Sequence, residues 1–184
     1  MPMTWFSKAP ASPTNGTTKT IAFVLKNDIH LGSIDPWVGV GSTTTFTGIF
    51  DGGGKTITGI LARNNTIGIF EQSTDAIIEN LNTGCVISGK ANNIVVGGII
   101  ATMNGGIVRN CHNMGSINGY TNGNNTVGGI VGLANGATIE NCSSSANTSG
   151  GIYIGGILGR SALKPTVLSD VRYYKGSLTC ANTF

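Results

Sequence analysis

The sequence predicts an all-β fold, a single-stranded parallel β-helix of about five to six coils, in which successive turns of the chain stack into a solenoid. Three observations predict it. Two short phrases recur about every 30 residues, glycine occurs 29 times, and charged residues make up only 10% of the 184 positions. Valines and isoleucines between the polar turns indicate strands and not a disordered linker. The length and the 40% of hydrophobic residues suit one domain with its own core.

The first recurring phrase is a glycine followed by two apolar residues. It occurs at Gly68-Ile69-Phe70, Gly98-Ile99-Ile100, Gly129-Ile130-Val131 and Gly156-Ile157-Leu158, at intervals of 30, 31 and 27 residues. The second phrase, of the type T-I-E-N-C, occurs at 77–81, 107–111, 138–142 and 167–171, at intervals of 30, 31 and 29 residues. Two independent phrases that keep one order and nearly one period indicate a solenoid, whose units bury their apolar faces against each other.

A third, looser phrase closes the units at 84–87, 115–118 and 176–179, so we expect three short strands in each coil. Helical repeats of similar length are excluded, because each glycine inside a helix costs about 1 kcal/mol. Gly, Asn and Ser separate the strands, and equivalent strands of successive coils are expected to pair in register about 4.8 Å apart.

Stacking places equivalent residues of successive coils above one another. One such column is predicted to be an internal aliphatic ladder: Ile69, Ile99, Ile130 and Ile157. A second column holds the asparagines that stand where a strand gives way to a turn: Asn80, Asn110 and Asn141. Asparagine tolerates the left-handed backbone conformation, and stacked amides hydrogen-bond to one another. We therefore interpret both columns as structural ladders and not as ligand sites.

The repeats also predict the boundaries within the chain. Residues 1–20 are expected to form an N-terminal cap or arm, and residues 21–180 the β-helix, with repeats near 66–94, 95–125, 126–152 and 153–180. A parallel β-helix exposes sheet edges at both ends, and such edges pair with other chains unless they are covered. We expect capping segments at both ends, the C-terminal one in the bulkier residues 167–178. An uncovered end instead predicts self-assembly.

Catalytic chemistry finds little support in the sequence. Polysaccharide-cleaving enzymes need two carboxylates that converge on one face. Glu79 and Glu140 share a column, but Arg109 lies between them, which predicts a charge-balanced outer ladder. His30 and His112 have no nucleophile motif beside them, and we interpret His112 as a solvated turn residue. The chain is therefore predicted not to be an enzyme, and a polysaccharide-active enzyme is the third alternative.

No metal or cofactor is expected either. The four cysteines form no CxxC pair, have no histidine cluster nearby, and are interpreted as core residues: Cys85, Cys111, Cys142 and Cys180. Cys111 and Cys142 occupy one column of adjacent coils, the one pairing for which a disulfide is sterically conceivable. Residues 51–54 predict a tight turn in which Asp51 bonds the following amides. It is not a phosphate loop, because position 49 is Ile and a strand follows.

Charge and hydropathy exclude two classes of partner. The net charge of +3 comes without a run of basic residues that would follow a phosphate backbone, so no nucleic acid is expected. No stretch approaches the roughly 20 apolar residues that cross a bilayer, so no membrane insertion is expected. A candidate glycan-binding face offers four aromatic rings: Tyr120, Tyr153, Tyr173 and Tyr174. The last two have a structural alternative, since large residues often cover the open end of a terminal coil.

The order of several motifs resembles a known family. Leu25, the N-D-I at 27–29 and Trp37 precede the string F-T-G-I-F-D-G-G-G-K-T-I-T-G-I at 46–60. V-G-G-I-V-G follows at 127–132 and T-I-E-N-C at 138–142. This order, over roughly residues 21–160, resembles that of bacterial surface proteins with GLUG-motif repeats.

The resemblance implies a right-handed β-helix, usually part of a secreted or cell-surface adhesin-like protein, whose motif residues are structural. We accordingly expect a non-catalytic surface or adhesion module, outside the cell, that presents a rigid lateral face to a glycan or a cell surface. The alternative is a self-assembling structural subunit of an extracellular filament, phage tail or virion, whose partner is another copy of the chain.

Overall fold

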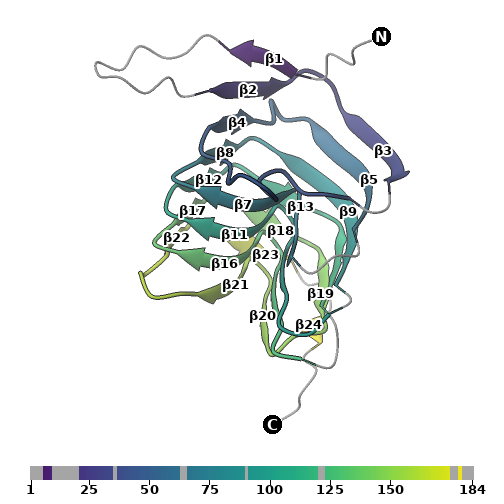
Figure 1. Cartoon of the computed structure of the whole chain (residues 1–184), viewed down its shortest axis with the longest axis vertical. Helices are drawn as coiled ribbons and strands as arrows, with labels where there is room; N and C mark the ends of the chain where they lie inside the picture. Colours follow the sequence, from purple (N-terminus) through teal and green to yellow (C-terminus); the bar gives the residue numbers. More distant parts are fainter. Residues whose placement is uncertain are drawn as a thin grey trace.

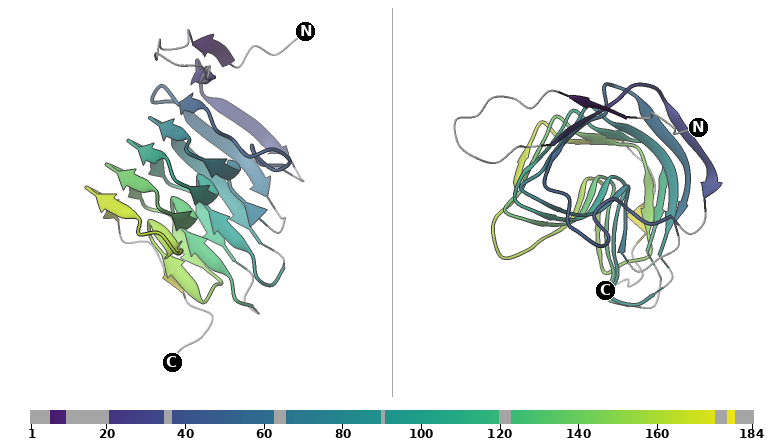
Figure 2. Two further views of the ribbon diagram at one scale, coloured as in Figure 1. Left: turned by 60° about the vertical axis from the view of Figure 1, so that its left-hand side comes forward. Right: turned by 45° about the horizontal axis from the view of Figure 1, so that its top comes forward.

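The computed structural model describes residues 6–9, 21–34, 37–62, 66–89, 91–119, 123–174 and 178–179. In these residues all regular structure is strand, and parallel strands stack as a β-solenoid of about five turns, which confirms the predicted fold class. Figure 1 shows the coils piled along one axis, and Figure 2 shows the same stack from the side and nearer to its end.

The described strands form four sheets that run along the stack. Sheet D contains β6 (Thr66–Ile67), β10 (Val95–Gly97), β15 (Thr126–Gly128) and β20 (Tyr153–Gly155). Sheet C contains β7 (Phe70–Thr74), β11 (Ile100–Asn104), β16 (Val131–Asn135) and β21 (Leu158–Ser161). Sheet A contains β1 (Phe6–Ala9), β2 (Ala22–Leu25), β4 (Ile49–Asp51), β8 (Ile77–Glu79), β12 (Ile107–Arg109), β17 (Thr138–Glu140) and β22 (Val167–Ser169). Sheet B contains β3 (Ile29–Ile34), β5 (Thr56–Ala62), β9 (Asn82–Ser88), β13 (His112–Asn113), β14 (Ser116–Asn118), β18 (Ser143–Ser144), β19 (Asn147–Ser149), β23 (Arg172–Tyr173) and β24 (Leu178–Thr179).

A central coil therefore runs through sheets D, C, A and B in turn, and the expected three strands per coil are corrected to at least four. The reason lies in the V-G-G phrase. Its valines belong to two strands in two sheets, β15 and β16 in the central coil, and Gly129 and Ile130 form the turn between them.

The strands of sheet A pair as the alignment of the second recurring phrase predicts. Val108 lies between Ile78 and Ile139 on the neighbouring strands, and Leu168 follows Ile139. The first three side chains are fully buried, so each packs on its copies in the adjacent coils. Burying one such side chain contributes about 1.5–3 kcal/mol, and the inner columns therefore supply most of the apolar stabilisation.

Sheet B corrects the alignment of the third phrase by one residue. Ile117 pairs with Ile87, and both are fully buried, whereas alignment of the glycines places Ile117 beside Val86. Val86 points outward and is 48% exposed, because side chains alternate between the two faces of a strand. The alternation decides the register here, since a slip of one residue turns every apolar side chain of a strand to the other face.

The turn between sheets D and C folds the coil inward, as the right-hand view of Figure 2 shows. A Cβ on Gly128 would lie 1.8 Å from the carbonyl oxygen of Val131, and a Cβ on Gly129 would lie 1.9 Å from that of Gly156 in the next coil. From the opposite sheet, the buried side chain of Asn113 donates from Nδ2 to the oxygen of Gly129 (2.6 Å). The inward turn thus reaches sheet B, and neither glycine has room for a side chain.

The same inward fold brings the outer faces of sheets C and D against each other. A Cβ on Gly132 of sheet C would lie 2.7 Å from Cγ1 of Val95 and the same distance from the carbonyl oxygen of Val96. Alternation along β15 turns Thr126 away from the core, yet this residue is almost fully buried. Glycine in sheet C therefore lets sheets C and D pack closely, so that part of the outer face of the coil is buried.

Phenylalanines and a covering segment close the N-terminal end of the stack. The ring of Phe70 packs edge to face on that of Phe50 (centroids 5.1 Å apart) and lies 5.2 Å from that of Phe46. Nε1 of Trp37 donates to the carbonyl oxygen of Gly68 (3.0 Å) and holds the segment 37–46 over β7. Of the segment 1–20, only residues 6–9 are described; they form β1, which pairs antiparallel with β2.

At the C-terminal end, the sequence predicts a cap in residues 167–178, and the structure differs from that prediction. Residues 167–173 continue the coil, since β22 pairs in register with β17 and β23 with β18. Among the described residues, no strand pairs with the outer edges of β20, β21 and β22. Leu168 is 48% exposed although its copies in the preceding coils are fully buried. The described part of the predicted cap is therefore one more coil, because its strands keep the hydrogen-bonding register of the repeat.

Candidate functional site

The three asparagines form one hydrogen-bonded ladder at the corner that follows sheet A. Their φ angles are 54° at Asn80, 54° at Asn110 and 47° at Asn141, in the left-handed region. Asn110 donates from Nδ2 to Oδ1 of Asn80 (3.0 Å), and Asn141 donates to Oδ1 of Asn110 (2.7 Å). Asn80 donates in turn to Oδ1 of Asp51 (2.9 Å). The amides bind each other, so the column acts as a structural ladder.

The isoleucine column lies at the inward turn. The backbone nitrogen of Ile99 donates to the oxygen of Ile130 (3.0 Å), and the nitrogen of Ile130 donates to the oxygen of Ile157 (2.9 Å). All four members are buried in the core: Ile69, Ile99, Ile130 and Ile157. These residues hold the turn in place and present nothing to solvent.

Two carboxylates of sheet A, those of Glu79 and Glu140, are paired with one arginine. Nε of Arg109 lies 2.6 Å from Oε2 of Glu79, and its Nη1 lies 3.9 Å from Oε1 of Glu140. The hydrogen bond with Glu79 and the charge of that residue raise the pKa of Arg109 above its ordinary value. Both glutamates thus share one guanidinium as their counter-charge, and Arg109 stands between them in the column.

The described cysteines are buried in the core. Cys111 and Cys142 are free and fully buried, and Cys85 is likewise free and buried. The hydrogen bond to Cys142 and burial raise the pKa of Cys111 well above its ordinary value, which keeps it a neutral thiol. Cys180 lies outside the described residues. In the described part of the chain, no three His, Cys, Asp or Glu residues come together as metal ligands.

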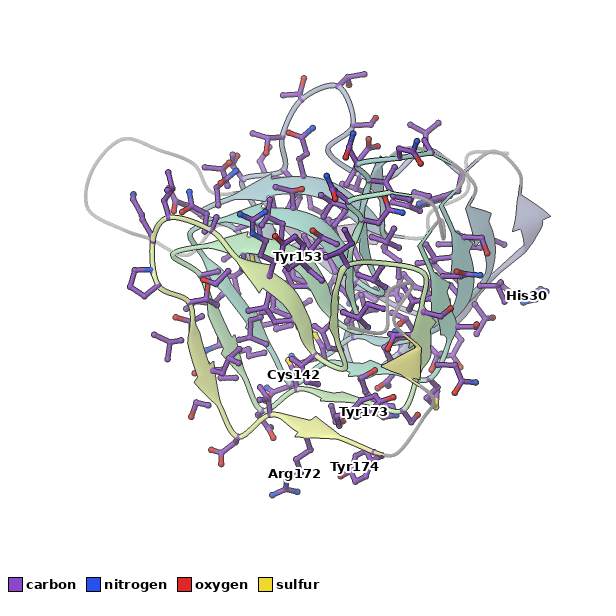
Figure 3. All side chains as sticks on the ribbon, turned by 90° about the horizontal axis from the view of Figure 1, so that it is seen from below. His30, Cys142, Tyr153, Arg172, Tyr173 and Tyr174 are labelled. Atoms are coloured by element: carbon purple, nitrogen blue, oxygen red, sulfur yellow. The ribbon has the colours of Figure 1, made fainter. Side chains whose placement is uncertain are left out.

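The tyrosines do not share one face. Tyr153 lies in sheet D, 43% exposed, with the guanidinium of Arg160 4.8 Å from its ring centre. Tyr173 points into the coil and donates from its hydroxyl to the carbonyl oxygen of Ala146 (3.3 Å). Tyr174 points outward and is 51% exposed. In Figure 3 Tyr153 lies apart from the other two, and Tyr120 is outside the described residues.

The predicted aromatic face is corrected accordingly. Tyr173 occupies the inner column that continues from Ser144, so strand alternation turns its ring toward the core and only Tyr174 toward solvent. Tyr153 and Tyr174 belong to different sheets, D and B. Two separated rings, not four adjacent ones, are available on the described surface.

A histidine–serine pair lies on the outer face of sheet B. Nδ1 of His112 is 2.6 Å from the hydroxyl oxygen of Ser143, on the neighbouring strand. The interpretation of His112 as a solvated turn residue is wrong, because it lies in β13 and is half-buried. The spacing of 31 residues between the two, the same as between Asn110 and Asn141, is the signal that predicts their contact.

The outer residues of sheet B form two adjacent columns, which we call the sheet B face. One column contains Asn82, His112, Ser143 and Arg172. The other contains Gly84, Met114, Ser145 and Tyr174. The two columns stand two residues apart along each strand, about 6.6 Å at the usual rise of a strand, so they form one continuous surface.

A shallow groove of about 260 Å³ runs along the corner between sheets C and A, and we call it the corner groove. Its lining residues are Thr74, Asp75, Asn104, Gly105, Asn135, Gly136 and Lys164. Asn135 donates from Nδ2 to Oδ1 of Asn104 (3.4 Å), and the backbone nitrogen of Lys164 donates to Oδ1 of Asn135 (3.0 Å). This is a second amide ladder that the sequence analysis missed; the repeated Asn-Gly pair at an interval of 31 residues is the signal that could have revealed it.

Comparison with known proteins identifies the central coil. Residues 123–149 match the model of a family described as the GLUG motif, which confirms the resemblance inferred from the sequence. The matched residues contain the inward glycine turn and the third asparagine of the ladder. No curated protein and no solved structure matches the chain. Within the described residues, no helix has the length and apolar character needed to span a bilayer.

Proposed function

We propose that this GLUG-motif β-helix is a non-catalytic surface module, working outside the cell, that binds a glycan or another cell-surface component by its rigid lateral face. The corner groove carries the proposal. It offers amide, hydroxyl, carboxylate and ammonium groups in one shallow channel along the stack. Such groups hydrogen-bond to sugar hydroxyls, and a channel parallel to the stack suits an extended polymer.

The distribution of carboxylates supports a binding role over an enzymatic one. Glu79 and Glu140 are both paired with Arg109. Asp51 accepts hydrogen bonds from the backbone of Gly53 (2.8 Å) and from Asn80. Hydrolysis of a glycoside needs one protonated and one ionised carboxyl group facing the same bond. We therefore expect no new reducing ends when the protein is incubated with a panel of polysaccharides, and their appearance would overturn the non-catalytic assignment.

A glycan array tests the binding role directly. The intact protein is expected to retain members of the array, and Lys164→Glu, which reverses the only cationic side chain of the corner groove, is expected to change which members are retained. Lys26→Glu is the matched control, since Lys26 is exposed and stands outside the groove. An array without any retained glycan, or equal changes in both variants, contradicts the proposal.

A second candidate, self-assembly, is favoured by the C-terminal end of the stack. Edge strands without partners among the described residues and the half-exposed Leu168 make a surface on which another copy can add β-structure. Analytical ultracentrifugation over a range of concentrations should then show large species that Leu168→Glu abolishes. Sedimentation as a monomer at all concentrations removes this candidate.

A further inference from the structure

The sheet B face contains an arginine, Arg172, that makes no ion pair with any described carboxylate. Arg109 is paired with glutamates, and Arg160 lies over the ring of Tyr153. Arg172 is exposed, and within the described part of the chain no carboxylate pairs with it. An unpaired guanidinium is a planar donor that matches a carboxylate or a sulfate with two parallel hydrogen bonds.

Donors and one aromatic ring surround this arginine. Ser143 and His112 precede Arg172 in the same outer column, one coil apart from each other. Nδ1 of His112 is hydrogen-bonded to Ser143, so Nε2 of this half-buried side chain is the ring nitrogen that is left for a ligand. Tyr174 belongs to the adjacent column, and Figure 3 shows it next to Arg172, both pointing away from the coil. The ring and the half-exposed Met114 offer apolar area for one face of a sugar.

No described residue of the sheet B face is acidic from β9 to β23. The described acidic residues lie on the other sheets, at the corners or at the N-terminal end: Asp28, Asp51, Glu71, Asp75, Glu79, Glu140 and Asp170. Asp170 is close in sequence, but it continues the asparagine column and makes no ion pair with Arg172. A ligand with an acidic group therefore meets an attractive charge on this face and no described carboxylate beside it.

We infer that the sheet B face binds an acidic glycan, whose carboxylate or sulfate group pairs with Arg172 and whose sugar ring stacks on Tyr174. Ser143 and Nε2 of His112 then bond hydroxyl groups of the neighbouring sugar unit. This inference rests on the proposed function and names the ligand class for a face separate from the corner groove.

Calorimetric titration of the whole chain tests the inference. Three oligosaccharides of equal length serve as ligands: an oligogalacturonate, a sulfated oligosaccharide and an uncharged oligomer. We expect an acidic ligand to bind at least about tenfold more tightly than the uncharged one, and added salt to reduce the difference. A preference for the carboxylate or for the sulfate supports the inference equally and identifies the acidic group.

Matched variants separate this face from a general charge effect. Arg172→Gln is expected to lower the association constant for the acidic ligand about tenfold, the loss typical of a charged hydrogen bond. Arg160→Gln changes the net charge equally and is expected to stay within about twofold, as a surface charge away from the site does. Tyr174→Ala is expected to weaken binding of that ligand and Tyr153→Ala to leave it unchanged. Thermal unfolding followed by circular dichroism confirms that the exposed substitutions leave the fold intact.

The outcomes distinguish the two proposals. Equal losses in Arg172→Gln and Arg160→Gln, or equal binding of acidic and uncharged ligands, overturn the sheet B face as the site. If glycan binding then responds only to Lys164→Glu, the proposed function stands without this inference. If none of the glycans binds the intact protein, both proposals fail.

Discussion

The central coils and the last described coil contain the same sequence phrases, but equivalent side chains are more exposed in the last described coil. Ile139 is fully buried, whereas Leu168, its equivalent one coil later, is 48% exposed. The atom nearest to a Cβ on Gly129 would be the carbonyl oxygen of Gly156, whereas the nearest described atoms to a Cβ on Gly156 belong to the side chain of Tyr173. In a solenoid, burial and steric constraint come from the neighbouring coil and not from the residue itself.

The largest expected effect is the difference in stability loss between two alanine substitutions in one buried column of sheet A. Ile139→Ala should lower the free energy of unfolding by about 2–5 kcal/mol, because it leaves a cavity between two coils. Leu168→Ala should cost only about 1 kcal/mol, because half of its surface is already in water. Urea denaturation followed by circular dichroism measures both. Equal losses would mean that the last coil is covered as fully as the central ones.

The glycine turn gives the next largest difference. Gly129→Ala should cost about 1–3 kcal/mol or prevent folding, because the added methyl group meets backbone atoms that cannot move independently. Gly156→Ala should cost less, because the nearest atoms belong to one side chain, that of Tyr173, whose displacement breaks one hydrogen bond but moves no backbone of a further coil. Denaturation midpoints of the two variants check the order. A greater loss at Gly156 would show that the terminal coil is the more constrained one.

The asparagine ladder stops before the last coil, and one substitution should extend it. Asp170 has a φ of 50° and continues the column, but its carboxylate has no N–H to donate to Asn141. Asp170→Asn should therefore raise the free energy of unfolding by about 0.5–1.5 kcal/mol, the usual value of one hydrogen bond. Asp75→Asn is the control, because Asp75 has a φ of 49° but lies outside this column. An equal gain in the control would mean that loss of a charge, and not the ladder, stabilises the protein.

The smallest effect concerns the first coil of sheet C. Glu71 stands in the column that later contains Ala101, Gly132 and Gly159, and burial raises its pKa above the ordinary value. The folded state thus holds this proton to higher pH than the unfolded state, so stability falls as the pH rises through the glutamate range. Glu71→Gln should give a slightly higher Tm at pH 7 and an unchanged one near pH 3, measured by thermal unfolding. A gain of the same size at both pH values would point to a cause other than ionisation.

Much of the fold was predictable because each coil repeats the one before it. The interval between Asn110 and Asn141 predicts that their side chains lie one above the other, and the hydrogen bond between them agrees. The same interval relates His112 to Ser143, and that pair was missed because the two residue types differ. A column of identical side chains can be found by looking for the same residue type at the repeat interval. A column of different side chains is found only when the strand register is known.

Other features of the candidate surfaces could not be predicted from the recurring sequence phrases. The exposure of Tyr174 and the burial of Tyr173 depend on which face of β23 points inward. The burial of Thr126 depends on the close approach of two sheets whose strands are adjacent in the chain. The corner groove depends on how far the turns of successive coils project. All three are set by distances between coils or sheets.

By itself, the sequence determined the solenoid, its period and the residues that stack, because a repeated pattern of apolar side chains and turns can bury its apolar face only against its own copies. The tertiary structure alone decided the inward glycine turn, the uncovered edges of the last described coil and the composition of the sheet B face. Those features depend on whether a segment of one coil packs against another segment or has no neighbour among the described residues. A local sequence pattern does not encode the distance between segments that are far apart in the fold.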